Sequence, residues 1–477
     1  MSFLQLPQKK SLTSSPLRTL TIVSCLLFVL YIIVSLSVSH TLSDHHVWSK
    51  SLFTTSLTSL DDVVFGIASN SEDWPKRKRY MQLWWKPQFK GCLFLEKVPL
   101  EKDSSNSADD IPPVCISEDA SHFRYTHKHG GGRRSAIRVA RVVSETVALN
   151  HSNVKWYVFG DDDTIFIPEN LVKTLSKYDH KQWYYIGTSS EIWEQNDWFS
   201  HEMAFGGAGF AMSYPLAKVF ARVFDSCLVR YPHLYGSDAR IYSCLAELGV
   251  VLTRESGFHQ FDVRGDIFGL LASHPLKPLV SLHHLDYAQP IFPNMTTSQG
   301  LEHLFKAVKL DPARILQQTV CYDRWYTWTV LISWGYAVQV FDRNVLLPDL
   351  LPVQQTFKPW KIGGNVHSNL FMFNTKALPQ DECKRPMTFF LENISSSSGR
   401  MLSSYKRSIN ESCMENSKSF LKNLLHIRVF SQKLDLDVPK LQAPRRQCCD
   451  VIASSVGNRL DVAIRECGEE ELIFMHT

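Results

Sequence analysis

The chain has 477 residues, of which 44% are hydrophobic and 12% aromatic, and its formal net charge is +4. This apolar content is sufficient for a full hydrophobic core and excludes an intrinsically disordered protein, and the length predicts two or three structural units. The small and thinly spread charge gives no support to the binding of nucleic acid.

The first predicted element is a membrane-spanning helix. No charged residue occurs between Leu20 and Val38, and Lys9, Lys10 and Arg18 precede this stretch. Its length is about what a helix needs to cross a bilayer, and the preceding cations place the N-terminus in the cytosol. The expected segments are a cytosolic tail, a signal anchor and a stem, at residues 1–18, 19–39 and 40–60. The alternative, a cleaved signal peptide, fits less well because the apolar core is long and no clear cleavage site follows.

Two features agree with a lumenal position for the rest of the chain. Glycosylation sequons begin at Asn150, Asn294, Asn393 and Asn410. Of the 11 cysteines, one lies in the predicted anchor, which leaves an even set of ten for disulfides in an oxidising compartment. The adjacent Cys448 and Cys449 are expected to pair with two different partners.

Apolar strand-like runs alternate with helical patterns from the stem to about residue 300. The strand-like runs are at 62–69, 91–98, 154–159 and 183–187, and the helical patterns are at 135–149, 168–177 and 215–230. This alternation predicts an α/β layered domain with a mostly parallel sheet over residues 61–300. In such sheets, ligands bind beyond the carboxyl ends of the strands.

Three consecutive carboxylates follow the strand-like run at 154–159. Asp161, Asp162 and Asp163 separate it from a second apolar piece. Aspartate is a poor strand former, and three together repel one another unless a positive charge lies among them. Carboxylates at the mouth of a core strand suit Mg²⁺ or Mn²⁺, which can hold a diphosphate. The alternative is an acidic turn that only precedes a helix beginning at Pro168.

Two further motifs have both a structural and a functional interpretation. The basic run at 76–79 either forms a solvated first helical turn or supplies a cation to an anionic donor. The glycines Gly206, Gly207 and Gly209 either form a tight turn or allow a backbone or a flat ligand to approach closely.

Candidate polar groups also occur later in this domain. Asp238 lies in the first turn of a predicted helix, where the helix dipole stabilises its charge, so it is either a capping-region acid or a functional one. His283 and His284 follow an apolar run, and a neutral imidazole is a good Mn²⁺ ligand. A histidine pair at a strand end is also a common structural or surface feature.

The region 301–477 is predicted to be β-rich and contains six of the cysteines. This region either helps to recognise a ligand or braces the preceding domain. Its aromatic residues suit either sugar stacking or a buried β-core, and they include Trp325, Tyr326, Trp328, Trp334, Tyr336 and Trp360.

Taken in order, these motifs resemble those of one family. They are the N-terminal anchor, the strand ending in three aspartates, Phe-Gly-Gly-Ala-Gly-Phe at 205–210, Tyr-Gly-Ser-Asp at 235–238 and His-His-Leu-Asp at 283–286. The set resembles the Fringe-like β-1,3-glycosyltransferases (glycosyltransferase family 31), most closely their plant branch, which carries a domain of unknown function. The likeness extends from about Val63 to the C-terminus.

The resemblance implies a GT-A-like fold, a UDP-sugar donor, Mn²⁺ (or Mg²⁺) and inversion at the anomeric carbon. By this resemblance Asp161, Asp163 and His284 are the metal positions, with Asp163 the expected direct ligand. The expected nucleotide-sugar contacts are Asp161, Asp162, Gly206 and Gly207.

The expected protein is a single-pass type II Golgi membrane glycosyltransferase whose catalytic part faces the lumen. It would move a hexose or N-acetylhexosamine from a UDP-sugar to a glycan or glycoprotein hydroxyl, with a β-1,3 linkage by resemblance. Relatives carry two acids where this chain has Asp238 and Ala239, so the acid usually credited as the base falls on Ala239. Asp238 is therefore the candidate base. The alternatives are a catalytically impaired sugar- or nucleotide-sugar-binding paralogue and a structural Ca²⁺-binding lumenal protein.

Overall fold

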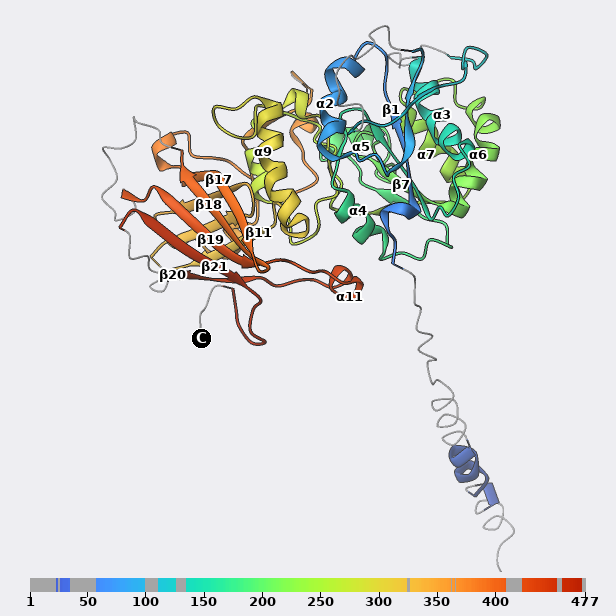
Figure 1. The fold of residues 1–477 in the computed structure, drawn as a ribbon. Helices are drawn as coiled ribbons and strands as arrows, with labels where there is room; N and C mark the ends of the chain where they lie inside the picture. The colour runs from blue at the N-terminus through green and yellow to red at the C-terminus, as the bar shows by residue number, and fades with distance from the viewer. Residues whose placement is uncertain are drawn as a thin grey trace, which may run out of the picture. The chain divides into compact units, whose positions relative to one another are not determined.

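The computed structural model describes most of the chain. The described residues are 23–24, 26–34, 57–98, 110–125, 134–323, 327–361, 363–364, 366–408, 423–452 and 457–473. The chain divides into two compact units, Met1–Leu57 and Thr58–Thr477. The fold of the second unit carries the candidate site (Figure 1).

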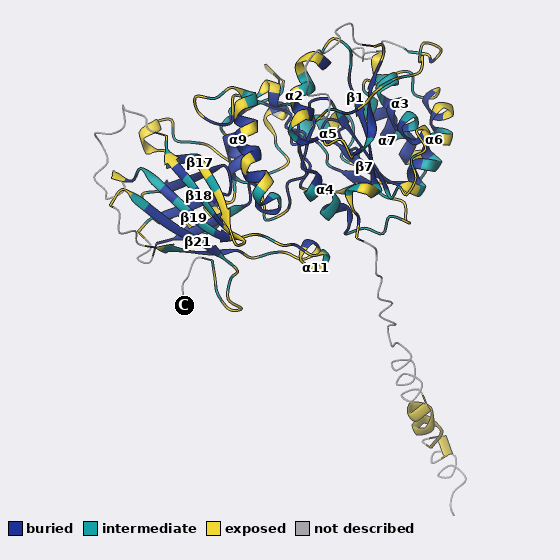
Figure 2. Cartoon of the chain, viewed as in Figure 1, coloured by how far each residue is buried: buried dark blue, intermediate teal, exposed yellow. Residues whose placement is uncertain are grey.

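In the first unit, residues 23–24 and 26–34 are helical and exposed (Figure 2). None of the helices within the described ranges combines the length and the apolar content that a bilayer crossing requires. The predicted tail, part of the predicted anchor and most of the predicted stem lie outside the described residues. The anchor at 19–39 therefore stays a prediction.

Seven strands form the first sheet of the second unit, in the order β3-β2-β1-β4-β7-β6-β8. Their bounds are β1 Val63–Ala68, β2 Lys90–Leu95, β3 Val114–Ile116, β4 Trp156–Asp161, β6 Tyr185–Gly187, β7 Phe210–Ser213 and β8 Leu252–Arg254. Pairing is parallel from β3 to β4 and between β6 and β8, whereas β7 is antiparallel to both of its neighbours. The result is a mixed sheet in which the parallel pairs predominate.

Helices cover both faces of this sheet because alternate residues of a strand point to opposite sides. Val64 and Ala68 of β1 belong to the apolar cluster under α3, α6 and α7, whereas Val63, Phe65 and Ile67 belong to the cluster under α2 and α4. The bounds are α2 Trp74–Trp84, α3 Ser135–Ala148, α4 Pro168–Leu175, α6 Tyr214–Leu228 and α7 Ser237–Glu247. Covering on both faces explains why β1 is buried along its whole length.

Several helix starts are encoded locally. Proline occupies one of the first two positions of α2, α4 and α6, where its missing N–H costs nothing. The helix α9 (Thr297–Leu310) begins with a capping box, in which Thr296 and Gln299 each accept a hydrogen bond from the backbone of the other.

Eight strands form the second sheet, in the order β11-β12-β13-β17-β18-β19-β21-β20. Their bounds are β11 Gln318–Tyr322, β12 Thr329–Ser333, β13 Ala337–Phe341, β17 Met387–Ser397, β18 Arg400–Arg407, β19 His426–Gln432, β20 Cys448–Ile452 and β21 Arg459–Arg465. The neighbours pair antiparallel, except that β19 and β21 are parallel. Trp334 and Tyr336, between β12 and β13, are buried, so these two aromatic side chains serve the core.

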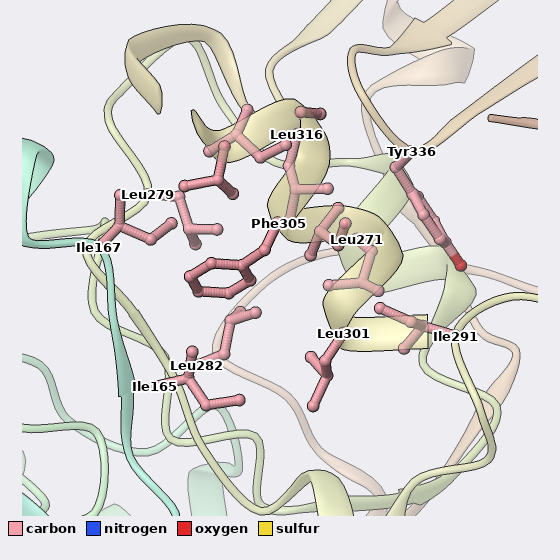
Figure 3. Packing of buried hydrophobic residues seen from close by; sticks show 14 of the residues in the cluster. Ile165, Ile167, Leu271, Leu279, Leu282, Ile291, Leu301, Phe305, Leu316 and Tyr336 are labelled. Atoms are coloured by element: carbon pink, nitrogen blue, oxygen red, sulfur yellow. The ribbon is translucent and has the colours of Figure 1, made fainter. Parts of the chain in front are cut away.

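A continuous apolar core joins the two halves of the second unit. The first half contains the first sheet, and the second half contains the second sheet. Leu301 and Phe305 project from α9 into a cluster that contains Leu279 from the first half and Tyr336 from the second (Figure 3). Each fully buried side chain of this kind stabilises the folded protein by about 1.5–3 kcal/mol. The predicted boundary between residues 300 and 301 falls inside α9.

Shorter elements complete the fold. Three two-stranded sheets pair β5 Ile165–Phe166 with β10 Ser281–Leu282, β9 Val263–Gly265 with β15 Phe357–Pro359, and β14 Val353–Gln354 with β16 Thr375–Lys376. The remaining helices are α5 Trp193–Trp198, α8 Phe268–Ala272, α10 Leu347–Leu350 and α11 Val438–Gln442. The pairing of β9 with β15 brings a segment of the C-terminal region against the first half.

Four disulfides join described cysteines to one another. They are Cys92–Cys115, Cys227–Cys244, Cys321–Cys449 and Cys448–Cys467. The separate partners of Cys448 and Cys449 confirm that prediction. Because Cys321 lies on β11 and Cys449 on β20, this bond ties together the first and last strands of the second sheet.

Candidate functional site

The turn after β4 holds the three predicted aspartates. The side chain of Thr164 fixes this turn, because its Oγ1 accepts a hydrogen bond from the N–H of Asp161 (2.7 Å) and donates one to the carbonyl of Gly207 (2.8 Å). Asp162 and Asp163 are buried, whereas the side chain of Asp161 is 38% exposed. The three aspartates therefore lie at the carboxyl end of a core strand, and Asp161 is the most exposed of them.

Asp161, Asp163 and His283 form a candidate metal site. One ligand atom from each lies within 4.8 Å of the others, and Nε2 of His283 is 3.2 Å from Asp163 Oδ1 and 4.0 Å from Asp161 Oδ2. Within the described part of the chain, no donor reaches Oδ1 of Asp163 with hydrogen-bond geometry. Two carboxylates and an imidazole are a set of ligands that suits Mn²⁺, and Oδ1 of Asp163 is a carboxylate oxygen that lacks a donor among the described residues.

A backbone carbonyl group fixes the orientation of the His283 ring. Its Nδ1 lies 3.2 Å from the carbonyl oxygen of Gln260, and because a carbonyl only accepts, this nitrogen carries a hydrogen. Nε2 therefore faces the carboxylates, which is the usual arrangement of a metal-binding histidine.

The charges in this group perturb one another. Burial opposes the charge of His283, but the carboxylates of Asp163 and Asp161 outweigh it and raise its pKa to about 9. Burial raises the pKa of Asp163, but His283 and Arg77 hold that pKa well below its usual range. Burial raises the pKa of Asp161 to about 7, with His283 opposing this effect and Asp163 and Asp238 adding to it. His283 and Asp163 therefore stabilise each other's charged form, whereas burial disfavours the charged form of Asp161.

Arg77 of α2 lies among the same carboxylates. Its guanidinium group is 2.8 Å from Asp162 Oδ1, 3.2 Å from Asp163 Oδ2 and 3.5 Å from Asp286 Oδ2. Asp162 also accepts a hydrogen bond from Ser69 (2.6 Å), so both oxygens of its carboxylate are bound by side chains of the protein. Of the basic run at 76–79, Arg77 is thus the member that reaches the acidic turn.

The two glycines predicted as nucleotide-sugar contacts make room for side chains of this chain. A Cβ atom on Gly206 would lie 2.6 Å from Oδ1 of Asp238, and one on Gly207 would lie 2.0 Å from Cε1 of His283. Both positions therefore require glycine for close approach. The approaching groups are the candidate base and the candidate metal ligand.

Asp238 shares a small cavity with Asp161. It stands in the first turn of α7, and its carboxylate accepts hydrogen bonds from the backbone of Gly206 and from the hydroxyl group of Ser237 (3.2 Å). Burial raises its pKa above the usual range. A raised pKa makes this carboxylate a stronger base than an ordinary aspartate.

Ala239 faces a different environment. It is 6% exposed and packs with Met203 and Phe205 in a small apolar cluster. The neighbouring residue, Asp238, is the one that reaches the cavity beside Asp161. An acid at position 239 would therefore be placed among apolar side chains.

The structure places His284 outside the group formed by Asp161, Asp163 and His283. Its ring stacks on Trp360, with centroids 4.5 Å apart and an interplanar angle of 13°. Its Nδ1 lies 3.2 Å from Oδ1 of Asp262. The prediction had assigned the metal position to His284, and the geometry gives that position to His283.

Sequence reasoning did not identify several residues around the site. Asp286 was noted only as the last residue of the His-His-Leu-Asp motif and was given no role. Asp262 was not considered as a site residue, and Gln260 acts through its backbone. Asp286 accepts a hydrogen bond from the hydroxyl group of Tyr80 and lies 3.3 Å from Arg79. The signal for His283 was its position directly after the buried strand β10.

Together, the fold and the site define a mixed α/β protein with a carboxylate–histidine cluster at a strand end. A family model described as "Protein of unknown function, DUF604" matches residues 195–449. The match covers more than half of the chain, and the protein belongs to this family. Gly206, Asp238 and His283 lie within the matched region, whereas the three aspartates precede it.

Proposed function

We propose that this protein is a metal-dependent glycosyltransferase that uses a UDP-sugar as donor and a glycan or glycoprotein hydroxyl as acceptor. The observation that carries the proposal is the convergence of Asp161, Asp163 and His283 beside a cavity that Asp238 also lines. The ordered motifs that resemble the Fringe-like transferases support the same reaction class. The transferred sugar is a hexose or N-acetylhexosamine, and the linkage is β-1,3 by resemblance.

Asp161, Asp163 and His283 would hold Mn²⁺ or Mg²⁺. When bound, the cation neutralises charge that develops on the leaving diphosphate. Arg77 lies 3.2 Å from Asp163 and adds a fixed positive charge at the same edge of the cluster. Gly206 and Gly207 allow the proposed base, Asp238, and the proposed metal ligand, His283, to lie close to this segment.

Asp238 acts as the general base. Its carboxylate accepts the proton of the acceptor hydroxyl as the new carbon–oxygen bond forms at the anomeric carbon. The bond from that carbon to the diphosphate breaks, and UDP carries away the electron pair. Attack opposite the leaving group inverts the anomeric configuration. The raised pKa of Asp238 suits this role.

The alternative of a binding protein without transfer rested on Ala239. Because Ala239 packs against Met203 and Phe205, an acid at that position is not needed for a carboxylate to line the cavity. Asp238 supports the catalytic proposal over the binding one.

The test is UDP release from a panel of UDP-sugars with Mn²⁺ and a mixed glycan acceptor set. The wild-type chain should release UDP in an acceptor-dependent manner, and Asp163→Ala should abolish release. Asp435→Ala is the matched control, because the side chain of Asp435 is 99% exposed and distant in sequence from the site. Failure of every donor with every acceptor would contradict the proposal.

We also propose that the protein is a single-pass type II Golgi membrane protein with residues 58–477 in the lumen. The described sequon asparagines Asn150, Asn294 and Asn393 are exposed, as glycan attachment requires; Asn410 lies outside the described residues. Digestion of the cellular protein with an N-glycosidase should increase its mobility on a gel. An unchanged mobility, together with cleavage of the C-terminal part by protease added outside intact membranes, would contradict this topology.

A further inference from the structure

His284 contacts two aromatic rings. The rings of His283 and His284 have centroids 3.8 Å apart, and Trp360 stacks on His284 at 4.5 Å. Trp360 lies nearly parallel to His284, at 13°, and the ring of His283 is tilted by 32° from that of His284. Trp360, His284 and His283 therefore form a continuous series of ring contacts, and the last ring of this series points Nε2 at Asp163.

The backbone at His284 needs this support. Its φ of 57° lies in the left-handed region, which is unfavourable for a residue with a Cβ atom. Such a conformation persists only where the surroundings hold it. The restraints on His284 are the stack with Trp360 and the nearby carboxylate of Asp262 (3.2 Å). A change of backbone conformation here would move the preceding residue, His283.

Trp360 comes from the C-terminal region, on a segment that we call the strap (residues 353–361). Its strand β15 pairs with β9, the strand that directly follows Asp262. The hydroxyl group of Thr356 donates to the carbonyl of Asp266 (2.6 Å) and accepts from the N–H of Gly269 (3.0 Å). The strap is therefore fixed to the first half on both sides of its strand.

Arg264 completes the attachment of Trp360. Its Nε donates a hydrogen bond to the carbonyl of Trp360 (2.8 Å), and its guanidinium carbon lies 4.4 Å from the centroid of the indole ring. Tyr287 meets the same indole edge-on, with centroids 4.6 Å apart. Cation–π and edge-to-face contacts of this kind are attractive and depend on ring orientation, so the indole has a defined position against His284.

We propose that Trp360 is a positioning residue of the metal site: it holds His284, and through it His283, in the orientation that binds the cation. This inference rests on the proposed function, because it concerns the same cluster. It gives the C-terminal region a direct part in building that site, beyond acceptor recognition or bracing. His283 is thus held in two ways. The carbonyl of Gln260 contacts its Nδ1, and Trp360 of the strap holds it through the ring of His284.

The test compares Mn²⁺ affinity, measured by titration calorimetry on the full-length protein, for three variants. Trp360→Ala should weaken Mn²⁺ binding about tenfold or more, as loss of an outer-shell support of a metal ligand does. Trp360→Phe keeps a ring on His284 and should stay within about threefold of the wild type by the same reasoning. Phe373→Leu is the matched control, because Phe373 packs against Phe357 of the strap and not against the histidines, and it should leave the affinity unchanged.

A double-mutant cycle separates positioning from general loosening. In the His283→Gln background, adding Trp360→Ala should cause no further loss of Mn²⁺ affinity, since the ligand that Trp360 positions is already gone. Wild-type affinity in Trp360→Ala, or an equal further loss in the His283→Gln background, would overturn the positioning role. Absence of Mn²⁺ binding by the wild type would instead overturn the proposed function.

Discussion

Charged side chains are arranged differently in the second sheet and at the end of the first sheet. In the C-terminal sheet, cations and acids are matched. Arg465 contacts Asp450 (2.8 Å) and Glu471 (2.7 Å), and Arg428 of β19 pairs with Asp461 of β21. These pairs hold neighbouring strands together and leave little net charge in one place.

The end of the first sheet gathers acids in excess. Around Arg77 and the two histidines stand six carboxylates, those of Asp161, Asp162, Asp163, Asp238, Asp262 and Asp286. Such crowding raises the free energy of the folded protein unless a cation joins the group. The contrast indicates that the second sheet is arranged for stability and that the strand end is arranged for binding.

The largest effect that would sharpen this contrast is expected for Asp238→Asn. The amide cannot accept the proton of the acceptor, so the transfer rate should fall by about 10²–10⁴-fold. Binding of Mn²⁺ and of UDP should change by less than about twofold, because Asp238 stands outside the metal ligands. Initial-rate kinetics and calorimetry provide the two measurements. A transfer rate equal to the wild-type rate would remove Asp238 from the mechanism.

The next effect concerns Ala239. Ala239→Asp places an ionisable group against Met203 and Phe205, and we expect the free energy of unfolding to fall by about 3 kcal/mol. Transfer should not increase. Ala246→Asp, at an exposed position of the same helix, is the matched control and should cost less than about 1 kcal/mol. Chemical denaturation measures both, and a faster transfer by Ala239→Asp would revive the impaired-paralogue alternative.

The junction between the halves gives a pH-dependent prediction. Burial and the neighbouring His259 lower the pKa of His274 to about 3, and the N–H of Gln318 in β11 donates to its carbonyl. His274 therefore binds a proton near pH 6.5 in the unfolded chain but remains neutral at that pH in the folded chain. The stability from neutral His274 is present above pH 6.5 and is lost as the pH falls towards 3, at up to about 1.4 kcal/mol per pH unit.

Denaturation at pH 7.5 and pH 5.5 tests this dependence. His274→Gln should reduce the loss of stability between the two values by about 1.4 kcal/mol, whereas replacement of the exposed His233 by Gln should not. An unchanged pH dependence in His274→Gln would show that His274 titrates freely in the folded protein.

The smallest effect is expected in the second sheet. Asp461→Asn leaves Arg428 with a weaker partner, and the free energy of unfolding should fall by about 1 kcal/mol. Mn²⁺ affinity should stay at the wild-type value, because this pair serves only the joint between β19 and β21. A clear loss of Mn²⁺ affinity would contradict the division of roles between the second sheet and the end of the first sheet.

The parts of this account that were predictable from sequence are those with a local pattern. The aspartates at the end of β4 follow an apolar run that shows where the strand stops, and Cys448 and Cys449 are too close in sequence to be expected as partners. The choice between His283 and His284 was not predictable, because it depends on the left-handed backbone at His284. A pattern of residue types contains no information on that angle.

Contacts between distant segments were also beyond the sequence. Trp360 reaches His284 only because β15 pairs with β9, and this register depends on the packing of the whole C-terminal region. The glycines at 206 and 207 were expected to form a tight turn or to admit a backbone or a flat ligand, whereas the groups beside them are the side chains of Asp238 and His283, from other elements. Close approach can be inferred locally, whereas its partner requires the fold.

The most direct test of the central claim is the dependence of UDP binding on Mn²⁺. Calorimetric titration of UDP into the wild-type protein should show saturable binding with Mn²⁺ present and none after chelation of the cation. Asp163→Asn should lose binding of both Mn²⁺ and UDP, while Asp435→Asn should keep both. UDP binding that persists without Mn²⁺, or that survives in Asp163→Asn, would contradict a metal-held nucleotide at this strand end.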